Sequence, residues 1–162
     1  MKIKKNIVLF CFILMKFVLI DNSGFSQTTF YSQGFESTND WTSSTSIGVN
    51  GNYWVWGSGD AHTGSNSLNI WEKQGANWYA NYGAYAGTST DMSKTFDFSS
   101  LGAATNITFS YWVKCNAESG YDDLNVLVNG AVAQGPWTGI TTYTQKTIDL
   151  TAYKGVASVP ID

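Results

Sequence analysis

The chain has 162 residues, which is enough for one domain, and 43% of them are hydrophobic whereas 13% are charged. It carries nine lysines, no arginine and twelve carboxylates, for a formal net charge of −3. Phosphate binding depends on clustered lysine and arginine, so this composition argues against a nucleic-acid partner and against binding to an anionic membrane surface.

Residues 1–26 have the form of a secretory signal peptide. Three lysines stand within the first five residues, the stretch 7–20 is apolar apart from Lys16, and Gly24 and Ser26 supply small residues before a cleavage point after Ser26. The alternative, a membrane anchor, is disfavoured because a spanning helix needs roughly 20 uninterrupted apolar residues. We therefore expect a mature chain that is secreted or held at the cell surface, without membrane insertion.

The mature chain, residues 27–162, favours short β-strands. Without the leader, five lysines and eleven carboxylates remain, a net charge of −6, and acidic groups in an exported β protein suit calcium. Helix formers are scarce, and Gly-rich turns separate the apolar stretches. This pattern predicts an all-β fold, an antiparallel jelly-roll β-sandwich preceded by the signal peptide. The predicted strands are 29–36, 41–49, 53–56, 67–71, 78–85, 94–98, 105–114, 124–128 and 143–150.

The clearest strand pattern lies between residues 105 and 130. Ile107, Phe109, Tyr111 and Val113 alternate with more polar residues, which is typical of a half-buried strand. A second strand, 124–128, ends in an Asn-Gly dipeptide that favours a tight hairpin turn. Another predicted turn is the Gly-Pro pair at 135–136. Near the end, residues 156–159 begin a further strand, so either a short last strand completes the sandwich or the last strand is missing from a fragment.

We find no catalytic constellation in the sequence and expect no enzyme activity. Glu118, Asp122 and Asp123 share one turn, where adjacent side chains point apart, so a solvated acidic turn is favoured over a glycosidase acid–base pair. His62 lies in a turn-like segment and is the one histidine. Cys115 is either a small apolar residue near a strand end, the site of an intermolecular disulfide, or a cysteine whose partner is missing from a truncated chain.

A carboxylate and a loop suggest a structural calcium site. Glu36 ends the first predicted strand, and the Gly-rich segment 59–68 contains Asp60 and Ser65. Calcium takes six to eight oxygen ligands, and a mixture of carboxylates and backbone carbonyls is usual. The alternative is that these are solvated turn residues.

Aromatic residues are the other informative feature, since the chain has seven tryptophans and nine tyrosines. Sugar rings stack on flat aromatic side chains, whereas a buried aromatic ring removes roughly 150–250 Å² from water and so serves equally well in a core. Tyr121 and Trp137 fall in predicted loops and are the expected exposed pair. Trp54 and Trp56 lie two apart in one strand, so both should face the core or both a ligand. The full set of candidates is Trp54, Trp56, Trp71, Trp78, Tyr82, Tyr85, Tyr121 and Trp137.

Several short motifs follow one another along the chain: Phe35-Glu36 with Trp41, the segment 62–68, the segment 94–99, the strand 107–112, Tyr121-Asp122 with Leu124, and the segment 148–153. In this order they resemble the secreted jelly-roll modules of the MAM-like, choice-of-anchor J and cleaved-adhesin group. The first half is also similar to carbohydrate-binding modules with a galactose-binding-like fold.

The resemblance implies a non-catalytic secreted module that binds carbohydrate or mediates adhesion, with an extracellular glycan or a cell-surface protein as partner. It also implies a structural calcium held by Glu36, by the loop that contains Asp60 and Ser65, and by an aspartate pair on a last strand that we expect to be missing here. The alternative that it implies is an N-terminal accessory or structural domain of a larger secreted hydrolase, a peptidase or glycosidase, present as a fragment.

Overall fold

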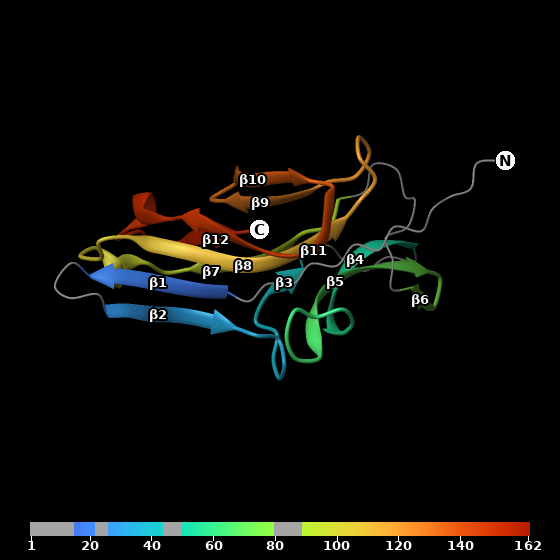
Figure 1. Cartoon of the computed structure of the whole chain (residues 1–162), viewed down its shortest axis with the longest axis horizontal. Helices are drawn as coiled ribbons and strands as arrows, with labels where there is room; N and C mark the ends of the chain where they lie inside the picture. The colour runs from blue at the N-terminus through green and yellow to red at the C-terminus, as the bar shows by residue number, and fades with distance from the viewer. Residues whose placement is uncertain (1–14, 22–25, 44–49, 80–88) are drawn as a thin grey trace.

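The computed structural model of the whole chain describes residues 15–21, 26–43, 50–79 and 89–162 (Figure 1). These residues form twelve strands and two short 3-10 helices, η1 (Ser99–Leu101) and η2 (Thr151–Tyr153). Every strand pairing in the described part of the chain is antiparallel. The prediction of an all-β antiparallel sandwich is confirmed.

The first sheet has four strands in the order β11-β8-β1-β2. They are β11 (Gly139–Asp149), β8 (Ile107–Asn116), β1 (Met15–Asp21) and β2 (Ser26–Gln33). In Figure 1, β1 and β2 lie along the lower edge of this sheet, beside β8. β1 falls inside the predicted signal peptide, and the expected cleavage point after Ser26 lies at the start of β2.

The second sheet has five strands in the order β10-β9-β12-β7-β3. They are β10 (Ala131–Trp137), β9 (Leu124–Val128), β12 (Val159–Ile161), β7 (Met92–Phe96) and β3 (Thr42–Ser43). The strand expected to begin within residues 156–159 begins at Val159 as the short strand β12, which pairs with both β7 and β9.

A third, smaller sheet lies at one end of the molecule (Figure 1) and has the order β4-β5-β6. Its strands are β4 (Asn50–Ser58), β5 (Asn66–Gln74) and β6 (Asn77–Tyr79). The predicted strands 41–49 and 78–85 extend into residues 44–49 and 80–88, which lie outside the described residues, as do the candidate aromatics Tyr82 and Tyr85.

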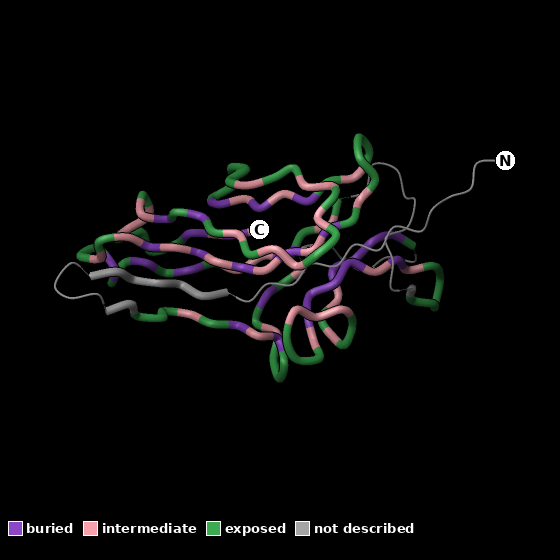
Figure 2. The backbone as a smooth tube through the Cα atoms, viewed as in Figure 1, coloured by how far each residue is buried: buried purple, intermediate pink, exposed green. Residues whose placement is uncertain are grey.

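One apolar core joins the three sheets, and Figure 2 shows buried segments on the strands that contribute to it. β8 alternates buried and half-buried residues from Ile107 to Cys115, as predicted. The second sheet and the β4–β5 pair add further buried side chains. The buried residues of the core include Trp54, Leu68, Ile70, Phe96, Ile107, Phe109, Tyr111, Val113, Cys115, Val126, Val128, Ile148, Val159 and Ile161.

The predicted Asn-Gly hairpin is also confirmed. Asn129 and Gly130 have φ values of 52° and 78°, and they connect β9 to β10. Positive φ at both central residues matches the right-handed twist of the flanking strands, which is why Asn-Gly is favoured there. The hairpin pairs β9 with the strand β10, which the sequence did not predict.

That partner, β10, passes through the Gly-Pro pair that the sequence assigns to a turn. Its register with β9 shifts twice, between Val132 and Gln134 and between Gln134 and Trp137, and Gly135 has a φ of 114°. A bulged edge strand tolerates proline because one side of its backbone needs no ladder hydrogen bonds. Trp137 therefore ends a strand and does not lie in a loop.

Candidate functional site

Two of the candidate tryptophans lie on β4, Trp54 in the core and Trp56 at the surface. Trp54 is only 9% exposed, and its indole Nε1 donates to the backbone oxygen of Thr90 at 3.0 Å. Trp56 is 39% exposed, and its Nε1 donates to the backbone oxygen of Phe35 at 2.7 Å. The expectation that both face the same environment is wrong, because the two exposures differ although both residues pair across the sheet with buried residues, Trp54 with Ile70 and Trp56 with Leu68. Trp54 is a core residue, and Trp56 is available to a ligand.

Beside Trp56, Glu36 anchors the loop that leads into β5. Its carboxylate accepts the backbone N–H groups of Ser65 and Asn66, each at 3.0 Å. The Asn66 side chain returns a hydrogen bond to the backbone oxygen of Glu36, also at 3.0 Å. Gly64 has a φ of 73° and passes close to the Glu36 carboxylate. Two segments that are about 30 residues apart in sequence are thereby joined next to the exposed tryptophan.

The other side of the same loop is fixed to the outer face of β8 and β11. The Asp60 carboxylate pairs with Lys114, and the Asp60 backbone oxygen accepts the hydroxyls of Ser67 and Tyr143. The ring of His62 stacks on Trp112 with centroids 3.9 Å apart and planes at 14°. The loop is therefore held from two directions.

The expected calcium ligands are only partly brought together. Glu36 and Ser65 meet, but through a backbone N–H group, and the carboxylate of Asp60 is engaged by Lys114. A calcium shell needs converging oxygens, whereas the loop offers N–H donors to Glu36. Across the described residues, no group of three or more His, Cys, Asp and Glu side chains is placed to hold a metal ion. As arranged, these residues do not fit a calcium ion.

The two aromatic residues predicted to be exposed, Tyr121 and Trp137, also differ in their exposure. Tyr121 is 83% exposed at the tip of the acidic turn, where its backbone N–H donates to the oxygen of Glu118 at 3.1 Å. Trp137 is half-buried against the core, with its ring centroid 6.1 Å from that of Tyr111 and the Lys146 ammonium 5.4 Å above it. Tyr121 is thus exposed as predicted, whereas Trp137 is half-buried.

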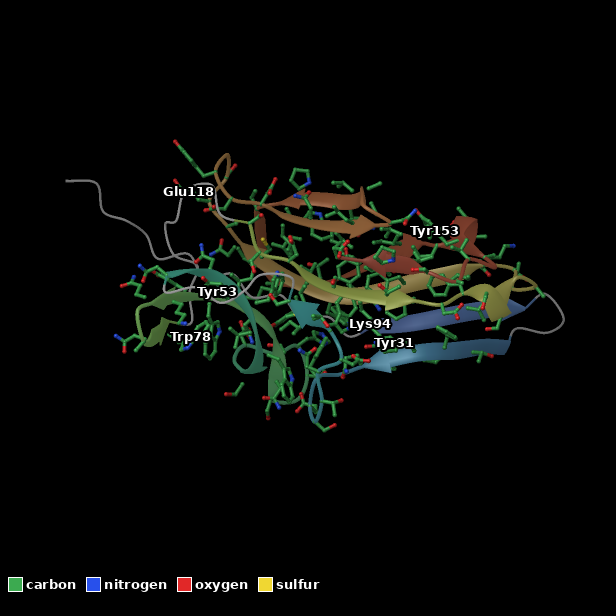
Figure 3. The ribbon with its side chains drawn as sticks, turned by 180° about the vertical axis from the view of Figure 1, so that it is seen from behind. Tyr31, Tyr53, Trp78, Lys94, Glu118 and Tyr153 are labelled. Carbon is green, nitrogen blue, oxygen red and sulfur yellow. The ribbon has the colours of Figure 1, made fainter. Side chains whose placement is uncertain are left out.

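A second surface aromatic lies at the far edge of the small sheet. Trp78 on β6 is 38% exposed, contacts Tyr53 edge to face at a centroid distance of 6.0 Å, and lies under Lys73 (Figure 3). Its exposure almost equals that of Trp56. It therefore provides a matched control for any experiment on Trp56.

A hydrogen-bonded network fixes the end of β2, from which Phe35 and Glu36 follow, and Figure 3 labels two of its members, Tyr31 and Lys94. The Asp40 carboxylate accepts from Tyr31 at 2.6 Å and from Gln33 at 2.9 Å, and pairs with Lys94 at 2.8 Å. Burial acts to raise the pKa of Asp40, but these hydrogen bonds outweigh it and hold the pKa below its usual value. A saturated carboxylate of this kind positions the chain and is poorly suited to acid–base chemistry.

Cys115 is fully buried in the core, and its thiol donates to the backbone oxygen of Trp137 at 3.2 Å. Burial raises the pKa of this thiol to about 12. A nucleophilic or disulfide-forming cysteine needs an accessible thiolate. The structure therefore favours the small apolar role for Cys115 over an intermolecular disulfide.

We predict that the Cys115 thiol of the native protein does not react with a thiol reagent such as Ellman's reagent at pH 8, because the reagent attacks only thiolate. The measurement uses a Cys11→Ser chain, so that Cys115 is the sole thiol. Addition of guanidinium should release one equivalent of colour. Rapid reaction under native conditions, at the rate of a free peptide thiol, would contradict the buried placement.

No described helix has the length and apolar character needed to cross a membrane. Comparison with known proteins yields no match, whether to a protein-family model, to a curated protein or to a solved structure. The side chains around Trp56 and the loop beside it are therefore the features of this chain that bear on its function.

Proposed function

We propose that this chain is a non-catalytic, secreted module that binds an extracellular glycan, with Trp56 as the stacking platform. The observation that carries this proposal is the fixed, half-exposed indole of Trp56, which is held by its 2.7 Å hydrogen bond to Phe35. A ring that is already immobile loses little conformational entropy when a ligand binds. Sugars offer apolar C–H faces to such rings.

Polar groups surround this indole. In the β4–β5 ladder, Trp56 is paired with Leu68 and Ser58 with Asn66, so Ser58 and Asn66 share the face of the sheet on which Trp56 lies. The carboxylate of Glu36, which accepts the backbone N–H groups of Ser65 and Asn66 (the Glu36 clamp), lies beside these residues. Hydroxyl and amide groups can both donate to and accept from sugar hydroxyls, and a carboxylate can accept from them. This combination of one flat apolar ring and a polar rim supports glycan binding more than it supports a purely apolar partner.

Cys115, the candidate nucleophile, is buried and its thiol pKa is raised, which supports a binding role over a catalytic one. Export, location at the cell surface and membership of the MAM-like and choice-of-anchor J group belong to the same proposal. A glycan-binding module of this kind would serve equally as an adhesin or as the accessory domain of a larger secreted hydrolase.

We expect Trp56→Ala to weaken glycan binding by about 2 kcal/mol, roughly thirtyfold in Kd, because truncation of a central aromatic anchor removes most of its contact. A glycan array would identify a ligand, and calorimetry would compare the variants. Trp78→Ala, with nearly the same exposure, should bind as the wild type does. Trp56→Phe keeps a ring but loses the hydrogen bond to Phe35, so it should fall in between.

Thermal unfolding of each variant separates loss of binding from loss of folding. Absence of binding to any glycan, or equal effects of the Trp56 and Trp78 substitutions, would refute the proposal.

A further inference from the structure

The strand β1 fills a position one strand wide between β2 and β8. It is antiparallel to both, and Val18 is registered with Thr29 on one side and with Thr108 on the other. Phe17 is paired with Phe109 and Leu19 with Ile107, two of the most deeply buried positions of β8. The edge of the strand that contributes most to the core is thus closed by residues 15–21.

These residues belong to the segment that the sequence predicts to be cleaved after Ser26. Cleavage at that point would remove β1 and leave the β8 backbone without a ladder partner on its β1 side over residues 107–110, while β11 stays paired on the other side. Unpaired strand backbone at a sheet is a ready template for another strand.

β2 cannot simply close the gap. β2 and β8 are both antiparallel to β1, so they run parallel to each other at about 9.6 Å, twice the usual strand spacing. The end of β2 is also anchored, since the Gln33 side chain binds the Phe35 backbone at 2.8 Å and Asp40 at 2.9 Å. Phe35 itself is fully buried in the core. Movement of β2 by one strand would break these contacts.

A second copy of the chain does not fit the gap either. Edge-to-edge pairing would bring in a strand that already has its own neighbour in a sheet, as β8 has β11. A gap flanked on both sides by β2 and β8 admits one isolated strand. The occupant that the geometry allows is a linear segment with no sheet of its own.

We propose that, after removal of the leader, the gap between β2 and β8 is a docking site for an extended peptide segment of another protein, bound antiparallel to β8. Main-chain hydrogen bonds to both neighbours would supply affinity, as in β-strand addition. The segment should have apolar residues at alternate positions, opposite Ile107 and Phe109, because the strand that occupies the gap in this chain has that pattern there.

The test uses the full chain with a specific protease site inserted between Asp21 and Ser26. The chain is cut, unfolded, and refolded in a large excess of a fluorescent peptide with the sequence of β1, Met15–Asp21. We expect the peptide to replace the cut segment at one per chain, seen as a rise in fluorescence anisotropy that co-elutes with the protein. The uncut chain, which keeps its own β1, should take up almost none.

Two altered peptides show whether the peptide binds as a strand. A Val18→Pro peptide should lose binding by at least about tenfold, since proline in a central strand removes a ladder hydrogen bond. A Met15→Pro peptide, changed at the strand end, should bind much better. Failure of the cut chain to take up the wild-type peptide, equal binding of the Val18→Pro peptide, or dimerisation of the cut chain in place of peptide binding would each overturn the proposal.

Discussion

Replacing Phe35 by alanine is expected to lower the free energy of unfolding by about 3–5 kcal/mol, the usual range for loss of a buried aromatic ring. Phe35 is 0% exposed and belongs to the central core. Its backbone oxygen also fixes the indole of Trp56. Urea unfolding followed by circular dichroism measures the loss directly. The cavity should also loosen Trp56, so the native fluorescence should shift.

A matched control is available in β2. Phe30 is 41% exposed and touches Phe98 edge to face at 6.0 Å. Phe30→Ala should therefore cost less than about 1 kcal/mol, within the ordinary range of a half-exposed position. Equal losses for the two variants would show that Phe35 is not held in the core as described.

The backbone at Phe35 allows a second comparison. Phe35 has a φ of 61°, in the left-handed region where a Cβ atom is unfavourable and glycine is not. Phe35→Gly should therefore be at least as stable as Phe35→Ala, by up to about 1 kcal/mol. At an ordinary strand position the order is reversed, because glycine loses more entropy on folding. If Phe35→Ala proves more stable than Phe35→Gly, the backbone strain at this position is absent.

The sequence predicts local features of this fold well where one periodicity is enough. Alternation along 107–113 is sufficient to predict β8 and its buried face, and Asn129-Gly130 is sufficient to predict the hairpin. It does not predict β10, because Gly135-Pro136 forms a turn in most contexts, and only a bulged edge strand makes it compatible with a ladder.

Features that depend on long-range partners were harder to predict. Period two shows that Trp54 and Trp56 share a face, but it does not show where along β4 the core stops. The sequence predicts Glu36 and the loop that contains Ser65 as ligands of one calcium ion, and the structure brings them together through the Glu36 carboxylate and the backbone N–H of Ser65. Sequence alone does not reveal whether a loop turns its N–H groups or its carbonyl oxygens toward a carboxylate, and this orientation decides between a clamp and a cation site.

Glu36→Ala is therefore expected to lower the free energy of unfolding by about 1–2 kcal/mol, the lower part of the range for hydrogen bonds to a charged group, because Glu36 is solvent-exposed. Glu36→Gln should retain part of this stability, since its amide oxygen can still accept from one backbone N–H group. Thermal unfolding in calcium and in a chelator gives the comparison. For a hydrogen-bonded clamp, the loss should be the same in both.

Gly64→Ala provides an independent test of the same clamp. A Cβ at this position would lie 2.3 Å from Glu36 Oε1, and the φ of 73° is strained for alanine. The carboxylate must then move away, so the clamp is lost in this variant too. Because both substitutions remove the same hydrogen bonds, Glu36→Ala should cost less in the Gly64→Ala background than in the wild type, and the double variant should fall short of the sum of the two losses.

Calcium dependence would reverse this interpretation. A native-state ligand raises the melting temperature in proportion to the logarithm of its concentration, so a calcium-induced rise that disappears in Glu36→Ala would make Glu36 a metal ligand. The loop would then have to turn carbonyl oxygens inward in place of the N–H groups of Ser65 and Asn66. Such a rearrangement would move the polar rim beside Trp56, and glycan affinity should then depend on calcium as well. If the Glu36 carboxylate binds only the backbone N–H groups and no calcium, the glycan affinity should be the same with calcium and with a chelator.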